Sequence, residues 1–201
     1  MTTLRFRRGI TRILATAVAA GALTVASPWG ADAASDLLGG HGRFEHPSAP
    51  HDGCNKYVRR DTNGVLDTWT VRSGSVFLVR GCGGLIEPAQ GNQFLVLGTP
   101  TDGNTADTAI CREVPTLAGH HYGVTLQAAS IFAASSVFTV SLGAASKAVR
   151  VLGGAIPNQW HRVATRFTAD AANTTLCVGA RRSSQATQFP AIDAVRMTAL
   201  D

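Results

Sequence analysis

The sequence predicts an all-β protein built as an antiparallel β-sandwich, and two observations support this prediction. After residue 33 no stretch keeps a helical period; instead, short segments rich in Val, Ile, Thr and Phe are bounded by Gly, Pro, Asn and Asp. Eleven such segments fall within 168 residues, which leaves no room for the helical crossovers of a parallel sheet.

The expected strands follow from local patterns. In the segment from Tyr122 to Gln127, apolar and small or polar residues alternate, as they do when one face of a strand is buried. Arg162 and Arg166 interrupt a later strand and indicate a solvated outer face, and Asn63-Gly64 favours a tight turn. The expected strands are residues 43–46, 68–72, 75–80, 93–97, 108–114, 122–129, 136–142, 148–152, 160–167, 174–178 and 191–197.

The first 33 residues have the features of a secretory signal peptide. Four arginines precede an uncharged apolar run at 13–26, and Ala31-Asp32-Ala33 is a small-x-small cleavage signal. The apolar run has 14 residues, fewer than the roughly 20 that span a bilayer. We therefore expect a signal peptide at 1–33, a flexible arm at 34–41 and a β-jelly-roll domain at 42–201, extracellular and without a membrane segment after cleavage.

The net charge of the chain is concentrated in this leader. The whole sequence has 18 basic and 13 acidic residues, but residues 1–33 hold four arginines and only Asp32, so that 14 basic and 12 acidic residues remain. A net charge of +2 on the remaining chain is far below the basic stripe of a typical nucleic-acid binder. We expect no nucleic-acid partner.

Four cysteines fit an exported protein with two disulfides. Three pairings are open; we favour Cys54 with Cys82, which flank one hairpin in Gly-rich loops, and Cys111 with Cys177, which lie in strand-like segments. No Cys-x-x-Cys pair occurs, which argues against a zinc site.

A series of short motifs in a fixed order connects the chain to a known family. The motifs are Gly42-Arg-Phe44-Glu45, Trp69-Thr-Val71, Pro88-x-x-Gly91-x-x-Phe94, Thr116-x-x-Gly119-x-x-Tyr122, Trp160 with Phe167, and Ala191-Ile192-Asp193. Over residues 42–198 the chain resembles galactose-binding-like β-jelly rolls, found as carbohydrate-binding modules on bacterial cellulases and xylanases. It is equally similar to secreted domains of unknown function first described from plant cell walls.

The resemblance implies a structural calcium ion. In the resembling modules it is held by the carboxylates that match Glu45 and Asp193, together with backbone carbonyls. This chain departs from the pattern at Ala194, where a second aspartate is usual. The alternative is that Glu45 and Asp193 are ordinary carboxylates that accept hydrogen bonds from nearby backbone.

The candidate ligand-binding residues are Tyr57, Arg112, Thr125 and Gln127. Tyr57 is the clearly exposed aromatic residue, since the family pattern places most others in the core, and stacking on sugar rings needs exposed aromatics. Arg112, Thr125 and Gln127 fall on strands that would line the concave face, or else they form a solvated sheet face.

The function predicted from the sequence is a secreted, non-catalytic and monomeric module that binds a carbohydrate or cell-wall polymer. The alternatives are an adhesive extracellular protein that binds protein partners and a glycan hydrolase. Hydrolysis is the weakest, because no Gly-x-Ser-x-Gly or His-Glu-x-x-His motif occurs and no spacing selects a catalytic carboxylate pair.

Overall fold

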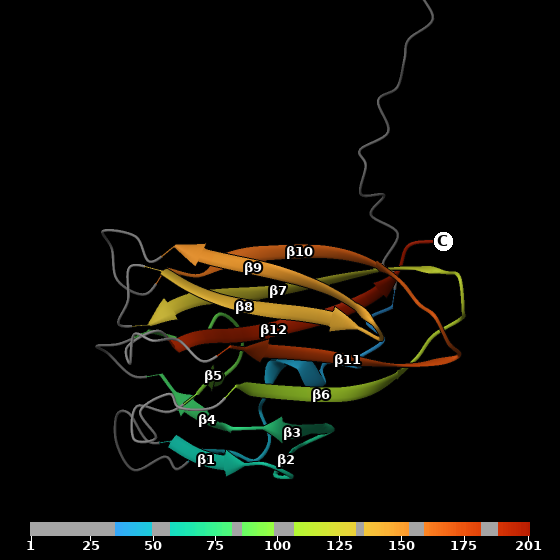
Figure 1. The fold of residues 1–201 in the computed structure, drawn as a ribbon. Coiled ribbons are helices and arrows are strands. Elements are labelled where there is room, and N and C mark those ends of the chain that lie inside the picture. The colour runs from blue at the N-terminus through green and yellow to red at the C-terminus, as the bar shows by residue number, and fades with distance from the viewer. Residues whose placement is uncertain are drawn as a thin grey trace, which may run out of the picture. The chain divides into compact units, whose positions relative to one another are not determined.

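The computed structural model describes residues 35–49, 57–81, 86–98, 107–131, 135–152, 159–181 and 189–201. In these ranges the chain forms two antiparallel six-stranded sheets (Figure 1). Sheet A has the strand order β1-β4-β5-β12-β7-β10, and sheet B has the order β2-β3-β6-β11-β8-β9. The fold is an all-β jelly-roll sandwich, as the sequence predicts.

Along the sequence the chain crosses repeatedly from one sheet to the other. Its elements are the 3₁₀ helix η1 (His41–Arg43), β1 (Tyr57–Asp61), β2 (Val65–Leu66), β3 (Trp69–Ser73), β4 (Ser75–Arg80), β5 (Gln93–Leu97), β6 (Thr108–Pro115), β7 (His121–Ile131), β8 (Ser135–Leu142), β9 (Ala145–Leu152), β10 (His161–Thr168), β11 (Asn173–Ala180) and β12 (Phe189–Ala199). At one edge of the sandwich β9 of sheet B lies beside β10 of sheet A (Figure 1).

The main core lies between the two sheets. On β7, Tyr122, Val124 and Leu126 are buried in it, and the intervening residues point to the outer face of sheet A. Facing them across the core are sheet B residues such as Ile110 and Phe138, neither of which is exposed. Side-chain alternation thus fixes which residues remain available on the outside.

The predicted strands agree with the observed ones except at the start of the domain. Residues 43–46 are not a strand: η1 ends at Arg43, and Phe44 adopts the left-handed conformation with a φ of 55°. This backbone turn directs the Phe44 ring into the core, where it packs on Trp69 with ring centroids 5.8 Å apart. The short strands β1 and β2 were not among the predicted segments.

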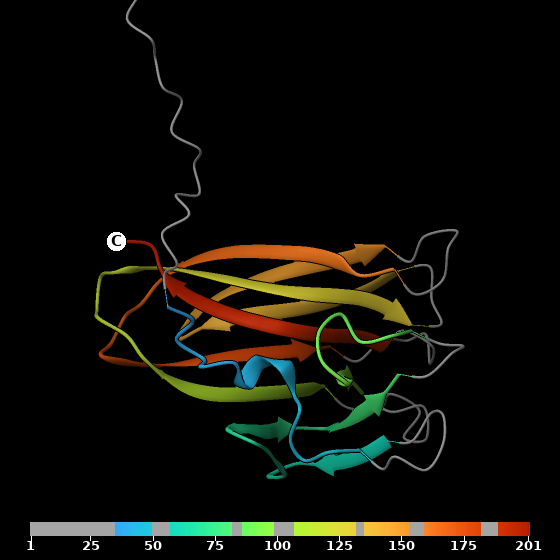
Figure 2. The same cartoon turned by 180° about the vertical axis from the view of Figure 1, so that it is seen from behind.

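The expected flexible arm is wrong for the part of residues 34–41 that the structure describes. Leu38 is fully buried, and the Leu37 amide donates to the Met197 carbonyl over 2.8 Å. The Asp36 carboxylate accepts the Met197 amide over 3.2 Å. Figure 2 shows this segment and η1 beside β12, which η1 contacts. The segment is therefore part of the folded domain.

The glycine of the opening motif, Gly42, lies in close contact with the backbone of β12. A β-carbon at this position would lie 1.9 Å from the Val195 carbonyl oxygen of β12. No side chain fits at that distance, so the close approach of η1 to β12 requires glycine.

The pairing of Cys111 with Cys177 is confirmed. The two residues face each other in the register of β6 and β11, and a disulfide joins them. Cys54, Cys82 and the predicted signal peptide at 1–33 lie outside the described residues. Within the described ranges, no helix is long and apolar enough to cross a membrane.

Candidate functional site

The outer face of sheet A has two different halves. At one end, a second apolar cluster gathers side chains from β4, β5, β7 and β12, including Phe77, Phe94 and Phe189. Ile86 and the partly buried Trp160 pack against this cluster. The Trp160 ring meets Phe94 edge-on at 5.6 Å, and its indole nitrogen donates to the Glu87 carbonyl over 2.7 Å. This half is therefore covered.

The other half of the face is open and polar. It contains a depression of about 350 Å³ between β7, β10, β12 and the segment before β5. The residues that line it are Ala89, Gln90, Thr125, Leu126, Gln127, Arg162, Ala194 and Arg196.

Strand register brings these polar side chains together. Gln127 of β7 lies opposite Arg162 of β10, and Thr125 lies opposite Arg196 of β12, so each pair projects from the same face. On β12 the pairing is interrupted by a bulge after Asp193, where Ala194 has a φ of 50°. The extra residue of the bulge reverses the alternation, which turns Val195 into the core and Arg196 outward.

Asp193 fixes residues 89–90, which form one wall of the depression. Its side chain is fully buried, and its carboxylate accepts the Gln90 amide over 2.8 Å and the Ala194 amide over 2.6 Å. Burial raises the pKa of Asp193 to about 7, and the nearby Glu45 acts in the same direction, against the backbone amides of Gln90, Ala194 and Ala89, which lower it. Residues 89–90 are thereby fixed over β12.

Glu45 holds the same segment from the other side. One of its oxygens accepts the Asn92 amide over 3.0 Å. Gly91 has a φ of 78°, and a β-carbon there would lie 2.0 Å from that same Glu45 oxygen. The buried Gln93 adds a third link, because its amide nitrogen donates to the Phe44 and Pro47 carbonyls and its oxygen accepts the Ala49 amide. Glu45 and Asp193 thus both accept hydrogen bonds from backbone amides of residues 90–92.

The two carboxylates fit a hard cation in charge and in position. They bring anionic oxygens from the first and last parts of the domain to one loop, and the buried Asp193 has no cationic side chain bound to it within the described residues. Each oxygen keeps a lone pair beyond its amide bond. In the part of the chain that the structure describes, no group of three or more His, Cys, Asp or Glu could hold a metal, so backbone or water oxygens would supply the other ligands.

The four candidate ligand-binding residues do not lie together. Thr125 and Gln127 line the depression, side by side on β7. Arg112 is on β6 of sheet B, and its guanidinium donates to the Leu38 carbonyl over 3.0 Å. Burial lowers the pKa of Arg112, although Asp67 and Asp36 oppose this effect. The expectation that Arg112 shares the concave face is wrong, because it points inward and holds the amino-terminal segment. Tyr57 lies on β1, whose partner is β4.

Three polar residues of the depression, Gln90, Arg162 and Arg196, were not predicted as ligand-binding. Arg162 carried a signal, since it marks the solvated face of its strand, but nothing in the sequence connects it to Gln127. Arg196 could not be placed from the sequence, because the bulge in β12 reverses which of the following residues point outward. Gln90 reaches the site only through the hydrogen bond of its backbone to Asp193, and its side chain accepts a bond of 3.4 Å from Arg196.

The fold is a β-jelly-roll sandwich with a loop that Asp193 anchors over β12. The chain matches the model of the family described as protein of unknown function DUF642 over residues 38–198, and it belongs to that family. No curated protein matches the sequence significantly.

Three solved structures illustrate the likeness in fold. The arabinose-bound MgGH51 α-L-arabinofuranosidase has a TM-score of 0.53 and 12% identity, covering 79% of this chain and 26% of that chain. The bacteriophage CBA120 tailspike protein 4 domain has a TM-score of 0.48 and 14% identity, covering 67% and 20%. A family 35 carbohydrate-binding module from Clostridium thermocellum has a TM-score of 0.47 and 10% identity, covering 71% and 97%. The chain thus spans about a quarter of the arabinofuranosidase and a fifth of the tailspike domain.

Proposed function

We propose that the protein is an exported, non-catalytic module that binds a glycan in the depression of sheet A. The observation that carries this proposal is a set of uncommitted polar groups on rigid strands. The side chains of Thr125, Gln127 and Arg162 make no hydrogen bond or ion pair with any part of the chain that the structure describes, and all three face the depression.

The chemistry of these groups suits sugar hydroxyls. The Gln127 amide both donates and accepts, Thr125 does the same, and the two arginines only donate. Polar groups fixed at set positions in a concave site give a ligand its orientation. Among the described residues, no aromatic side chain lines the depression, so hydrogen bonds rather than ring stacking would hold the sugar.

Export is supported by the leader-like residues 1–33 and by the Cys111–Cys177 disulfide, which is stable in an oxidising compartment. A non-catalytic role is supported by the lining of the depression, in which none of the described residues carries a carboxylate. A glycosidase needs two carboxyl groups that flank the scissile bond.

The test is binding to a broad panel of soluble polysaccharides, measured by affinity electrophoresis and calorimetry, with product release followed in parallel. We expect at least one ligand, no turnover, and an affinity about tenfold lower for Gln127→Ala, since a buried partner left without its hydrogen bond costs roughly 1 to 3 kcal/mol. The matched control is Thr175→Ala, which removes a hydroxyl bonded to Glu113 on sheet B and leaves sheet A intact. Binding unaffected by Gln127→Ala, or release of sugar, would contradict the proposal.

We also propose that Glu45 and Asp193 hold calcium, which would neutralise two carboxylates on the loop that walls the depression. The melting temperature should then rise with added calcium and fall with chelator, and Glu45→Gln should remove the difference. A melting temperature that does not respond to chelator would exclude a structural calcium ion.

A further inference from the structure

A second depression, of about 550 Å³, lies at the seam between the two sheets. It is formed by β9 of sheet B and β10 of sheet A, the neighbouring edge strands, and Lys147, Arg150 and Arg166 line it. Between these cations the lining consists of small and apolar residues such as Ala148 and Val163. The seam is therefore a shallow trough with basic sides.

The strands around this trough contain no acidic residue. Residues 121–168 include Lys147, Arg150, Arg162 and Arg166 but neither Asp nor Glu. This segment of 48 residues therefore carries a charge of +4, twice the net charge of residues 34–201. The weak overall charge of the domain hides a concentrated basic region.

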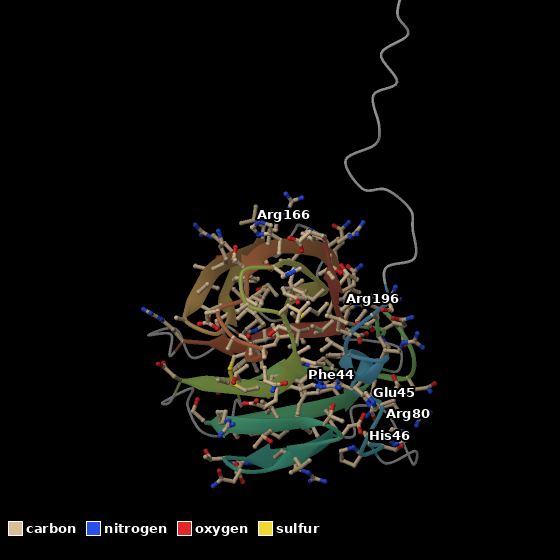
Figure 3. The ribbon with its side chains drawn as sticks, turned by 90° about the vertical axis from the view of Figure 1, so that its right-hand side faces the viewer. Phe44, Glu45, His46, Arg80, Arg166 and Arg196 are labelled. Carbon is tan, nitrogen blue, oxygen red and sulfur yellow. A yellow bond between two sulfur atoms is a disulfide. The ribbon has the colours of Figure 1, made fainter. Side chains whose placement is uncertain are left out.

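The two depressions adjoin each other across β10. Thr125 lines the first, Ala164 lines the second, and the two residues are direct partners in the register of β7 and β10. Ala164 is exposed and small, so β10 places no bulky side chain at this junction, whereas Gly123, the next outward position on β7, is covered by the side chain of Leu200. Figure 3 shows Arg166 at the edge of the sandwich and Arg196 on the adjoining face.

We call the five cations Lys147, Arg150, Arg162, Arg166 and Arg196 the basic track. The acidic residue of β12 beside it is Asp193, which is buried and hydrogen-bonded to backbone amides of the wall. Its carboxylate is therefore not exposed to a ligand lying on the track.

We propose that the basic track binds a linear acidic polysaccharide whose sugars carry carboxylate groups, laid across β10 from one depression to the other. This inference rests on the proposed function and specifies its ligand class. The guanidinium fork of Arg162 or Arg196 matches a carboxylate through two parallel hydrogen bonds. Thr125 and Gln127, between these arginines, would bind the neutral hydroxyls of the same sugars.

A polysaccharide fits better than a nucleic acid. Five cations in two shallow depressions, on a domain of charge +2, fall short of the extended positive surface that a duplex requires. A chain with one charge for each sugar needs only local cations, with amide and hydroxyl groups between them.

The experiment compares four probes at two salt concentrations, using the whole domain: polygalacturonate, neutral arabinoxylan, dextran sulfate and duplex DNA. We expect tightest binding to polygalacturonate and clear weakening at high salt, because exposed charges are screened. Arg162→Ala and Arg196→Ala should each lower this affinity about tenfold. Arg72→Ala, which removes one exposed charge from β3 of sheet B, is the control and should change it less than about twofold.

A length series tests whether the track is continuous. The double variant Lys147→Ala with Arg150→Ala should weaken binding of the long polymer about fivefold but leave a trigalacturonate, which occupies the first depression alone, within about twofold. Equal loss for polymer and trisaccharide would overturn the extended track.

The other outcomes separate the inference from the function on which it rests. Binding of arabinoxylan but not of polygalacturonate would overturn the inference and leave the glycan-binding proposal standing. Binding of none of the polysaccharides would overturn both. Equal or tighter binding of dextran sulfate or DNA would show attraction by charge alone and overturn the recognition of carboxylate sugars.

Discussion

The two halves of the outer face of sheet A belong to the same strands but have opposite properties. On β7, Ala129 and Ile131 lie in the covered apolar half, whereas Thr125 and Gln127 lie in the open polar half. The same change occurs along β12, from Phe189 in the covered half to Arg196 in the open one. Each of these strands thus contributes to the apolar cluster at one end and lines the open depression at the other.

The boundary between the halves is the segment that Asp193 and Glu45 anchor. Residues 86–92 contribute Ile86 to the covered cluster and Gln90 to the open depression. The position at which residues 86–92 are anchored therefore divides the outer face of sheet A into its two halves. The stability of the covered half and the shape of the open half should respond differently to substitution.

The largest effect is expected from Phe94→Ala in the covered half. Phe94 is 1% exposed, and removing a buried phenyl ring costs about 3 to 5 kcal/mol of the free energy of unfolding. Denaturant unfolding measures the loss, and the exposed Leu117→Ala should change stability by less than about 0.5 kcal/mol. Glycan affinity of the folded variant should stay within about twofold; a parallel loss of affinity would mean that the halves are not independent.

Asp193, at the boundary between the two halves, should make the free energy of unfolding depend on pH. With chelator present, the unfolded chain loses the Asp193 proton near its ordinary pKa, whereas the native state keeps it up to a pKa of about 7. The native state therefore binds more protons in this window, and stability falls as the pH rises from about 4 to about 7, by on the order of 3 kcal/mol.

The measurement is the difference in unfolding free energy between the protein and Asp193→Asn across this range. The wild-type curve should descend relative to the variant, and parallel curves would contradict the assignment. Calcium, if bound, should flatten the descent, because a cation favours the ionised carboxylate.

The smallest effect is expected from Gly91→Ala, which disturbs the loop without touching the apolar cluster. Positive φ alone costs about 1 kcal/mol, and displacement of the Glu45 carboxylate adds to this. Gly119→Ala is the matched control, since its φ of 84° is similar and nothing lies within 4 Å of the added carbon. Gly91→Ala should cost about 1 kcal/mol more than Gly119→Ala and weaken glycan binding; equal costs would show that the Glu45 contact is unimportant.

The sandwich could be predicted because each strand carries its own period and its own turn residues. Tyr122, Val124 and Leu126 alternate so regularly that their inward face was evident from the sequence. At the start of the domain no such local signal existed. Phe44 occupies a left-handed turn, Leu38 is buried in the main core, and its neighbour Leu37 is hydrogen-bonded to the distant Met197.

The site could be predicted only where one strand determined it. Thr125 and Gln127 are two residues apart, so a shared face followed from alternation. Arg112 shows the limit of that reasoning, because its strand belongs to the other sheet and its side chain points inward. Arg196 could not be placed, since a bulge depends on tertiary context and changes the face of every later residue.

The hydrogen bond from Leu37 to Met197 has a consequence for the covalent topology of the domain. It brings the beginning of the described chain beside its end, as Figure 2 shows. A short linker from residue 201 back to residue 35 would close the backbone into a ring without altering any strand pairing. Such cyclisation would restrict only the unfolded chain and so stabilise the folded one. The sandwich depends on the order of its strands, but it does not require the chain ends beside β12 to be separate.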